Sequence, residues 1–171
     1  GCGPVGLFCI KSAFLMGAGR VIAIDHQPNR LALARRNGAE TLNYHEVKVL
    51  EALKEMTAGI GPDACIDAVG MEAHGSPAGK AAQTAVGLLP DKLAQKAMET
   101  AGTDRLSALH GALDAVRRGG TVSLSGVYGG TASPMPLMNM FDKQLNLRMG
   151  QCNVKRWTDD LMPLVEDSAD P

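Results

Sequence analysis

The chain has 171 residues, of which 45% are hydrophobic and 4% aromatic, and its formal net charge at pH 7 is -1. This length suits one domain with a sizeable aliphatic core, while the few aromatic rings and the balanced charge argue against nucleic-acid or anionic membrane partners. No apolar stretch approaches the roughly 20 residues of a membrane span, and no signal segment is visible, so we expect a cytoplasmic protein.

The chain opens on a glycine-rich loop, Gly1-Cys2-Gly3-Pro4-Val5-Gly6. In a dinucleotide-binding unit the first glycine of such a loop allows a tight turn, the second lets a pyrophosphate approach the backbone, and the third lets helix and strand pack closely. Apolar residues follow at helical spacing as far as Met16, which places a helix N-terminus on the loop. The strand that should precede the loop is missing, so we expect a fragment truncated before its first strand.

A short β-branched run, Val21 to Ile24, predicts a buried parallel strand that ends on Asp25, nineteen positions after Gly6. At that spacing a carboxylate meets the adenosine ribose and repels a 2′-phosphate, which favours NAD over NADP. The alternative is that Asp25 caps the next helix, which has Pro28 near its first turn.

Helices and short apolar strands continue to alternate after Asp25, which predicts an α/β fold of the Rossmann type, a doubly wound parallel sheet. In the strand order 3-2-1-4-5-6 the absent strand is the central one, so the isolated chain is expected to be marginally stable. The expected elements are a helix from Pro28 to Asn37, a strand from Glu40 to Asn43, a helix containing Val49, Leu53 and Met56, a strand from Ala64 to Val69, a helix containing Leu106, Leu109, Leu113 and Val116, a strand from Thr121 to Ser125, and a strand from Leu145 to Met149.

Ligands of such sheets bind beyond the carboxyl ends of the strands, so Asp67 to Gly70 should border the adenosine side, although packing alone also explains this apolar run. The glycines of Gly126 to Gly130 would let backbone approach a flat ligand, with a plain hairpin as the alternative. Between Glu72 and Thr103 the alternation stops. This segment is either a helical excursion, for which Asp91 is a plausible N-cap, or a binding lid, and Asp104 is expected to cap the helix that follows.

The four cysteines and four histidines are dispersed along the chain, without C-x-x-C pairs or metal-ligand spacing. We therefore expect reduced, mostly buried thiols, no disulfide framework and no metal ligand. The residues are Cys2, Cys9, Cys65, Cys152, His26, His45, His74 and His110.

Taken together, the motifs resemble the NAD-binding domain of medium-chain, zinc-dependent alcohol dehydrogenases, most closely the branch of glutathione-independent formaldehyde dehydrogenases. The resemblance spans nearly the whole chain and accommodates the segment from Glu72 to Thr103. It is carried by GCGPVG, VIAID, GPDACIDAVGMEAHG, RRGGTVSLSGVYGG and FDKQLNLRMGQ, of which DAVGMEAHG and GVYGG are the most specific.

This resemblance implies a set of NAD-binding residues. Arg30 matches a basic contact near the ribose, with a solvated helix charge as its alternative. The implied set is Gly1, Gly3, Pro4 and Val5 at the pyrophosphate, Asp25 and Arg30 at the ribose, Val69 and Gly70 beside the adenosine, and Val127, Tyr128 and Met149 towards the nicotinamide.

The resemblance also implies a parent enzyme that uses NAD and zinc, oxidises a small alcohol or aldehyde, and forms a homo-oligomer, either a dimer or a tetramer. In that family a separate domain holds the catalytic zinc, so residues 1–171 would form one NAD-binding domain without catalytic or metal-binding residues, inactive alone. Three alternatives remain: a zinc-free quinone reductase of the same superfamily, a methyltransferase, which GVYGG and the last strand do not suit, and a non-catalytic NAD-sensing module.

Overall fold

The computed structural model describes residues 1–70, 106–128 and 135–166, in which helices and strands alternate along the chain. The expected segment from Glu72 to Thr103, with Asp91, and also Asp104 and Gly129-Gly130, lie outside the described residues. The helices are α1 Pro4–Leu15, α2 Pro28–Arg36, α3 Val49–Met56, α6 Ser107–Ala115, α7 Leu137–Asp142 and α8 Val154–Glu166; the strands are β1 Ile22–Asp25, β2 Glu40–Asn43, β3 Ala64–Asp67, β4 Thr121–Leu124 and β5 Asn146–Met149.

All observed strand pairs are parallel, which confirms the predicted α/β class. Strand β1 pairs with β2, with Asp25 opposite Asn43, and β3, β4 and β5 form a second sheet in that order. Parallel neighbours need long crossovers, and α2 and α6 supply two of them. Because the strands are parallel, their carboxyl ends lie along one edge of each sheet.

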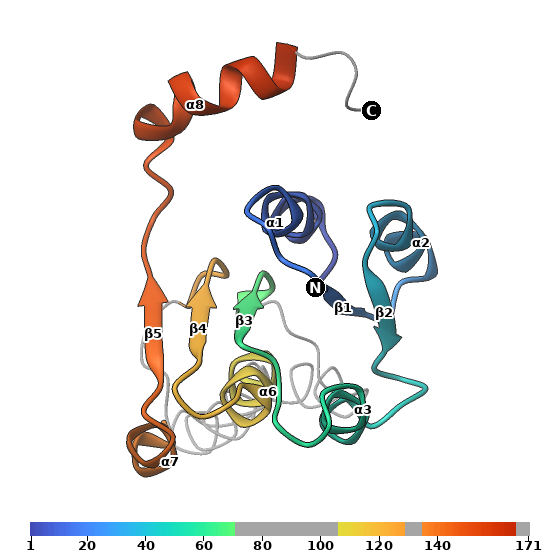
Figure 1. The fold of residues 1–171 in the computed structure, drawn as a ribbon, viewed down its shortest axis with the longest axis vertical. Coiled ribbons are helices and arrows are strands. Elements are labelled where there is room, and N and C mark those ends of the chain that lie inside the picture. Colours follow the sequence, from blue (N-terminus) through green and yellow to red (C-terminus); the bar gives the residue numbers. More distant parts are fainter. Residues whose placement is uncertain (71–105, 129–134, 167–171) are drawn as a thin grey trace, which may run out of the picture.

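The two sheets correspond to the two outer parts of the order 3-2-1-4-5-6. Strands β2 and β1 take positions 3 and 2, while β3, β4 and β5 take positions 4, 5 and 6. Among the described residues no strand joins the sheets, so β1 and β3 each keep an unpaired edge. Figure 1 shows the N-terminus and α1 lying between these two strands.

Each sheet has its own apolar core, because each is covered by helices that bring aliphatic side chains onto it. The apolar face predicted for α6 is confirmed, since its residues Leu109 and Leu113 are almost completely buried against Val122 of β4. Burying such a side chain contributes roughly 1.5 to 3 kcal/mol. The core on the β1–β2 sheet consists of the buried residues Cys2, Ile10, Ala23, Leu31, Ala34 and Ala39.

Glycines follow the ends of two helices. Gly17 has φ +90° and follows the last turn of α1, and Gly38 has φ +85° and follows α2. These φ values favour glycine because it has no Cβ. Soon after these two glycines, Arg20 and Glu40 form an ion pair with each other, with Glu40 at the start of β2.

Two helices and the state of the thiols depart from expectation. Neither α7 nor α8 was predicted from the sequence, and every described residue of α8 is exposed. All four cysteines are free, as expected, but only Cys2 is buried and Cys152 is exposed, so the prediction of mostly buried thiols was wrong. No helix among the described residues is long and apolar enough to cross a membrane.

Candidate dinucleotide-binding site

The glycine loop leads directly into the N-terminus of α1, with Pro4 in the first turn. Gly3 is the N-cap, with an extended backbone (φ -68°, ψ -174°), and its carbonyl accepts a hydrogen bond from Leu7 N at 2.9 Å. The first turn of α1 contains no acidic residue and has no side-chain cap. The partial positive charge of this helix end is therefore available to an anion.

The loop glycines differ in how much space surrounds them. A Cβ added at Gly6 would lie 2.0 Å from the carbonyl oxygen of Gly1, and one added at Gly1 would lie 2.5 Å from Val69 Cγ2. A Cβ added at Gly3 would have nothing within 4 Å. The first and third glycines of the motif thus permit close packing, while the second faces open space where a ligand could approach.

Asp25 joins the glycine loop to the end of β1. One carboxylate oxygen, Oδ2, accepts a hydrogen bond from Cys2 N at 2.7 Å, and Oδ1 accepts hydrogen bonds from His26 N at 2.7 Å and Gln27 N at 2.9 Å. Burial alone would raise the pKa of Asp25, but the three backbone donors outweigh it and leave the pKa lowered. Asp25 does not cap α2, since the N-cap of α2 is Gln27, without a side-chain cap.

Beside Asp25 lies a group of charged and aromatic side chains from α2 and from the residues that follow β1 and β2. Arg30 Nη1 is 3.8 Å from Asp25 Oδ2, and half of the Arg30 side chain is exposed. Tyr44 Oη is hydrogen-bonded to His26 Nδ1 at 2.5 Å, and the His45 ring packs on both rings. Neither His26 nor Tyr44 was predicted from the sequence to belong to this site.

The ends of β3 and β4 are held together by a second buried carboxylate. Asp67 accepts hydrogen bonds from Val69 N at 2.9 Å, from Gly70 N at 3.2 Å and from the hydroxyl of Tyr128. Burial and this contact raise the pKa of Tyr128. A Cβ added at Gly70 would lie 2.5 Å from Val127 N, so the turns after the two strands touch backbone to backbone.

The structure brings most of the predicted site residues to the carboxyl ends of the strands. Gly1 meets Val69, Gly70 meets Val127, and Met149 ends β5 in the register position next to Leu124 of β4. Val5, Val127 and Met149 are largely exposed and lie open to a ligand. The Tyr128 hydroxyl, by contrast, is engaged by Asp67.

The described residues do not fit a zinc ion. Nowhere in residues 1–70, 106–128 and 135–166 do three His, Cys, Asp or Glu side chains form a group able to hold a metal. Burial raises the pKa of the Cys2 thiol. It also raises the pKa of the Cys65 thiol, to about 11, so neither thiol is prepared as a thiolate ligand.

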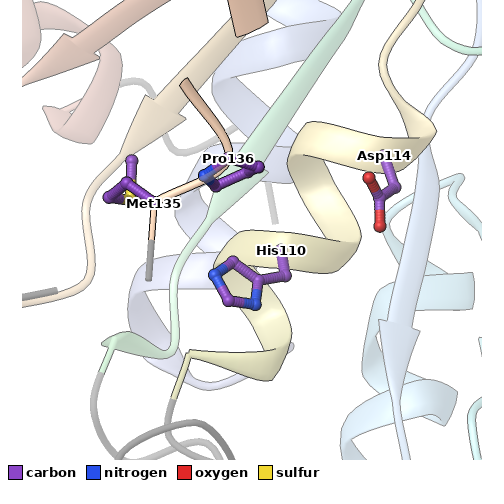
Figure 2. A pocket seen from close by; sticks show the side chains of 4 residues that line it. All are labelled: His110, Asp114, Met135 and Pro136. Carbon is purple, nitrogen blue, oxygen red and sulfur yellow. The ribbon is translucent and has the colours of Figure 1, made fainter. Parts of the chain in front are cut away.

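A hollow on the α6 side of the three-stranded sheet is separate from this site (Figure 2). His110 and Asp114 of α6 line it, together with Met135 and Pro136, which precede α7. No residue of the glycine loop contributes to it, and we assign it no role in cofactor binding.

Comparison with known proteins agrees with this geometry. A family profile described as zinc-binding dehydrogenase matches residues 4–89, half of the chain. The chain is 40% identical over 167 residues to the uncharacterized zinc-type alcohol dehydrogenase-like protein AdhB of Bacillus subtilis, covering 96% of this chain and 40% of that protein. It is 31% identical to a probable zinc-binding alcohol dehydrogenase of Mycobacterium tuberculosis, covering 97% of this chain and 34% of that protein.

Solved structures give the same result. The alcohol dehydrogenase of Thermus sp. ATN1 superposes with a TM-score of 0.73 at 30% identity, over 98% of this chain and 40% of that one. Zinc-dependent alcohol dehydrogenase 2 from Streptococcus pneumonia shares the fold, with a TM-score of 0.71 at 23% identity, over 99% of this chain and 39% of that one. The chain thus spans less than half the length of these relatives. Residues 4–89, which the family profile matches, include helix α1, Asp25 and Asp67. The chain belongs to the zinc-binding dehydrogenase family.

Proposed function

We propose that this chain is the NAD-binding part of a zinc-dependent oxidoreductase that transfers hydride from an alcohol or a hydrated aldehyde to NAD. The observation that carries the proposal is the hydrogen bond from Cys2 N to Asp25, because it unites the glycine loop and the strand-end acid in one site. The relatives described as zinc-type alcohol dehydrogenases support the choice of reaction. The glutathione-independent formaldehyde dehydrogenase branch is our proposal for the parent enzyme.

In this proposal the pyrophosphate lies over Gly3 at the N-terminus of α1, where the backbone is open and the helix end is positive. The adenosine ribose lies beside Asp25 and Arg30. Three of the roughly four lone-pair positions of the Asp25 carboxylate already accept backbone hydrogen bonds, so one remains for a ribose hydroxyl.

The nicotinamide extends towards Val127 and Met149, which are exposed at the carboxyl ends of β4 and β5. Tyr128 contributes there through its backbone, because its hydroxyl is committed to Asp67. When bound, NAD accepts the hydride, and the described residues serve to hold and orient it.

Zinc enters this proposal only through the parent enzyme. The described residues hold no suitable group of ligands, and the resemblance to medium-chain alcohol dehydrogenases implies a separate domain that holds the zinc, so we derive no catalytic step for this chain. We accordingly expect the 171-residue chain alone to show no alcohol oxidation.

Binding tests the cofactor part of the proposal. Titration with NADH and NADPH, followed by nicotinamide fluorescence at pH 8, should give tighter binding of NADH. Arg30→Ala should weaken NADH binding about threefold, because a partly exposed hydrogen bond to a ribose hydroxyl contributes about 0.5 to 1 kcal/mol. Arg36→Ala, at the exposed end of the same helix, is the matched control and should bind normally. Preference for NADPH at pH 8, or no binding of either nucleotide, would refute the proposal.

Activity tests the reaction. The parent enzyme should reduce NAD with formaldehyde in the absence of glutathione, and removal of zinc by a chelator should abolish that activity. Turnover of ordinary alcohols without formaldehyde would place the enzyme outside the proposed branch, and NAD binding without any turnover would favour an NAD-sensing module.

A further inference from the structure

A cluster of three rings lies beside the proposed ribose position, and the proposed function gives it no role. His26 directly follows β1, while Tyr44 and His45 directly follow β2. The ring centroids of His26 and Tyr44 are 5.0 Å apart, those of His26 and His45 are 5.0 Å apart, and those of Tyr44 and His45 are 4.7 Å apart. The cluster therefore sits where ligands of parallel sheets bind.

The His26 ring is held from two sides. Tyr44 Oη is 2.5 Å from Nδ1, and Gln27 Nε2 is 2.9 Å from Nε2. The ring is about one-third exposed, so it is fixed in position yet accessible at its rim. A protonated ring could keep Tyr44 as the partner of Nδ1 and donate from Nε2 to an incoming oxyanion in place of Gln27.

The charges around His26 nearly cancel when the imidazoles are neutral. His26 Nδ1 is 3.7 Å from Asp25 Oδ1, and Arg30 from α2 lies 3.8 Å from the other oxygen of the same carboxylate. Tyr44 is uncharged, and its pKa is raised by burial and by Asp25. Protonation of His26 or His45 would therefore make the cluster positive.

We propose that His26 is a specificity-determining residue of the adenosine end: with a neutral ring the site selects NAD, and with a protonated ring it also accepts the 2′-phosphate of NADP. This inference rests on the proposed NAD-binding function. Histidine is the side chain whose charge ordinarily changes between pH 5 and 8, so the selection should vary within that range.

The test is the ratio of the NADPH and NADH dissociation constants of the purified protein at pH 8 and pH 6. A partly exposed charge contact is worth up to about fivefold in affinity, so the ratio should fall about three- to fivefold at pH 6. His26→Gln and His26→Phe should remove most of this fall. The 2′-phosphate of free NADPH also titrates near pH 6, but this contribution is the same for every variant, so a difference between variants reports the ring.

Two matched histidine variants isolate the effect. His110→Gln, on α6, should keep the full pH response, and His45→Gln separates the contribution of the second imidazole. A response that is unchanged in both His26 variants, or that disappears only in His45→Gln, would overturn the inference. Failure of the wild type to bind either nucleotide at either pH would instead refute the proposed function.

If both His26 variants unfold, the wild type still provides a test. The ring proton of His26 can be followed by NMR against pH with NADH or NADPH bound. NADPH should move the titration midpoint of His26 to higher pH than NADH does, because a phosphate favours the charged ring. Equal midpoints with the two nucleotides would contradict the inference.

Discussion

The contrast between Gly3 and Gly6 yields the most discriminating prediction. Both residues belong to the glycine loop, and alanine at either position adds one Cβ. At Gly6 that atom would lie 2.0 Å from the Gly1 carbonyl oxygen, about 1 Å inside the 3.0 Å limit of real Cβ contacts. At Gly3 it would meet no protein atom within 4 Å. Gly6→Ala should therefore destabilise the fold, whereas Gly3→Ala should weaken ligand binding.

The magnitudes follow from these distances. Overpacking of backbone against backbone costs up to about 3 kcal/mol, and replacement of a helical glycine by alanine returns about 1 kcal/mol, so Gly6→Ala should lose about 2 kcal/mol. For a chain of this length that corresponds to a fall in melting temperature of roughly 4 to 8 °C. Gly3 already has an extended backbone that alanine adopts before a proline, so Gly3→Ala should change stability by less than about 0.5 kcal/mol.

The assays are thermal unfolding by circular dichroism and NADH binding by fluorescence. Gly3→Ala should melt like the wild type and bind NADH at least about tenfold more weakly, because the Cβ occupies the proposed pyrophosphate position; tenfold corresponds to about 1.4 kcal/mol. Normal NADH binding by a folded Gly3→Ala protein would refute the pyrophosphate assignment. An unchanged melting temperature for Gly6→Ala would refute the packing argument.

Three further substitutions test the buried polar contacts. Tyr128→Phe removes the hydroxyl donor of Asp67 and should lower the free energy of unfolding by about 1 to 3 kcal/mol in urea titrations, whereas an unchanged value would mean that water replaces the hydroxyl. Because the pKa of Asp25 is lowered in the folded chain, its stabilisation is complete above the unfolded pKa near 4 and is lost as pH falls through the folded value. The destabilisation of Asp25→Asn should thus be largest at pH 7 and shrink towards pH 3 in melting experiments; a constant difference would contradict this. Lys143 donates hydrogen bonds to two carbonyls at the end of α6, at 2.7 and 3.1 Å, so Lys143→Met should cost about 1 kcal/mol while Lys155→Met on α8 costs nothing measurable.

The elements that the sequence predicted well are those with strong local patterns. The β-branched run ending on Asp25 forms β1, and the spacing of Leu109 and Leu113 forms the buried face of α6. Helix α8 carries a comparable pattern, with Trp157, Leu161 and Leu164 at helical spacing, yet it was not predicted. Its apolar face packs against no core among the described residues, and the pattern that predicted the other helices, apolar residues that cover a sheet, does not apply to it.

The contacts that complete the candidate site depend on segments far apart in sequence. Tyr128 reaches Asp67 across 61 positions, and Tyr44 reaches His26 across 18. No local periodicity encodes such pairs, because they form only when parallel strands lie next to each other. The order of the strands was predicted only by analogy with other Rossmann-type sheets. The one available signal was that β3, like β1, ends on an aspartate after an apolar run.

Asp25 shows why the substitution of a conspicuous site residue can give a misleading result for cofactor specificity. Asp25 has the position expected of a ribose-binding acid, but it is almost completely buried and accepts a hydrogen bond from Cys2 in the loop itself. Its replacement would release the loop as well as the ribose, so reduced binding of both NADH and NADPH could not be assigned to specificity. Arg30 and His26 lie at the accessible side of the same carboxylate. Substitutions there leave the bond between Asp25 and Cys2 in place, and they are the changes whose effect on cofactor choice can be attributed to direct contact with the nucleotide.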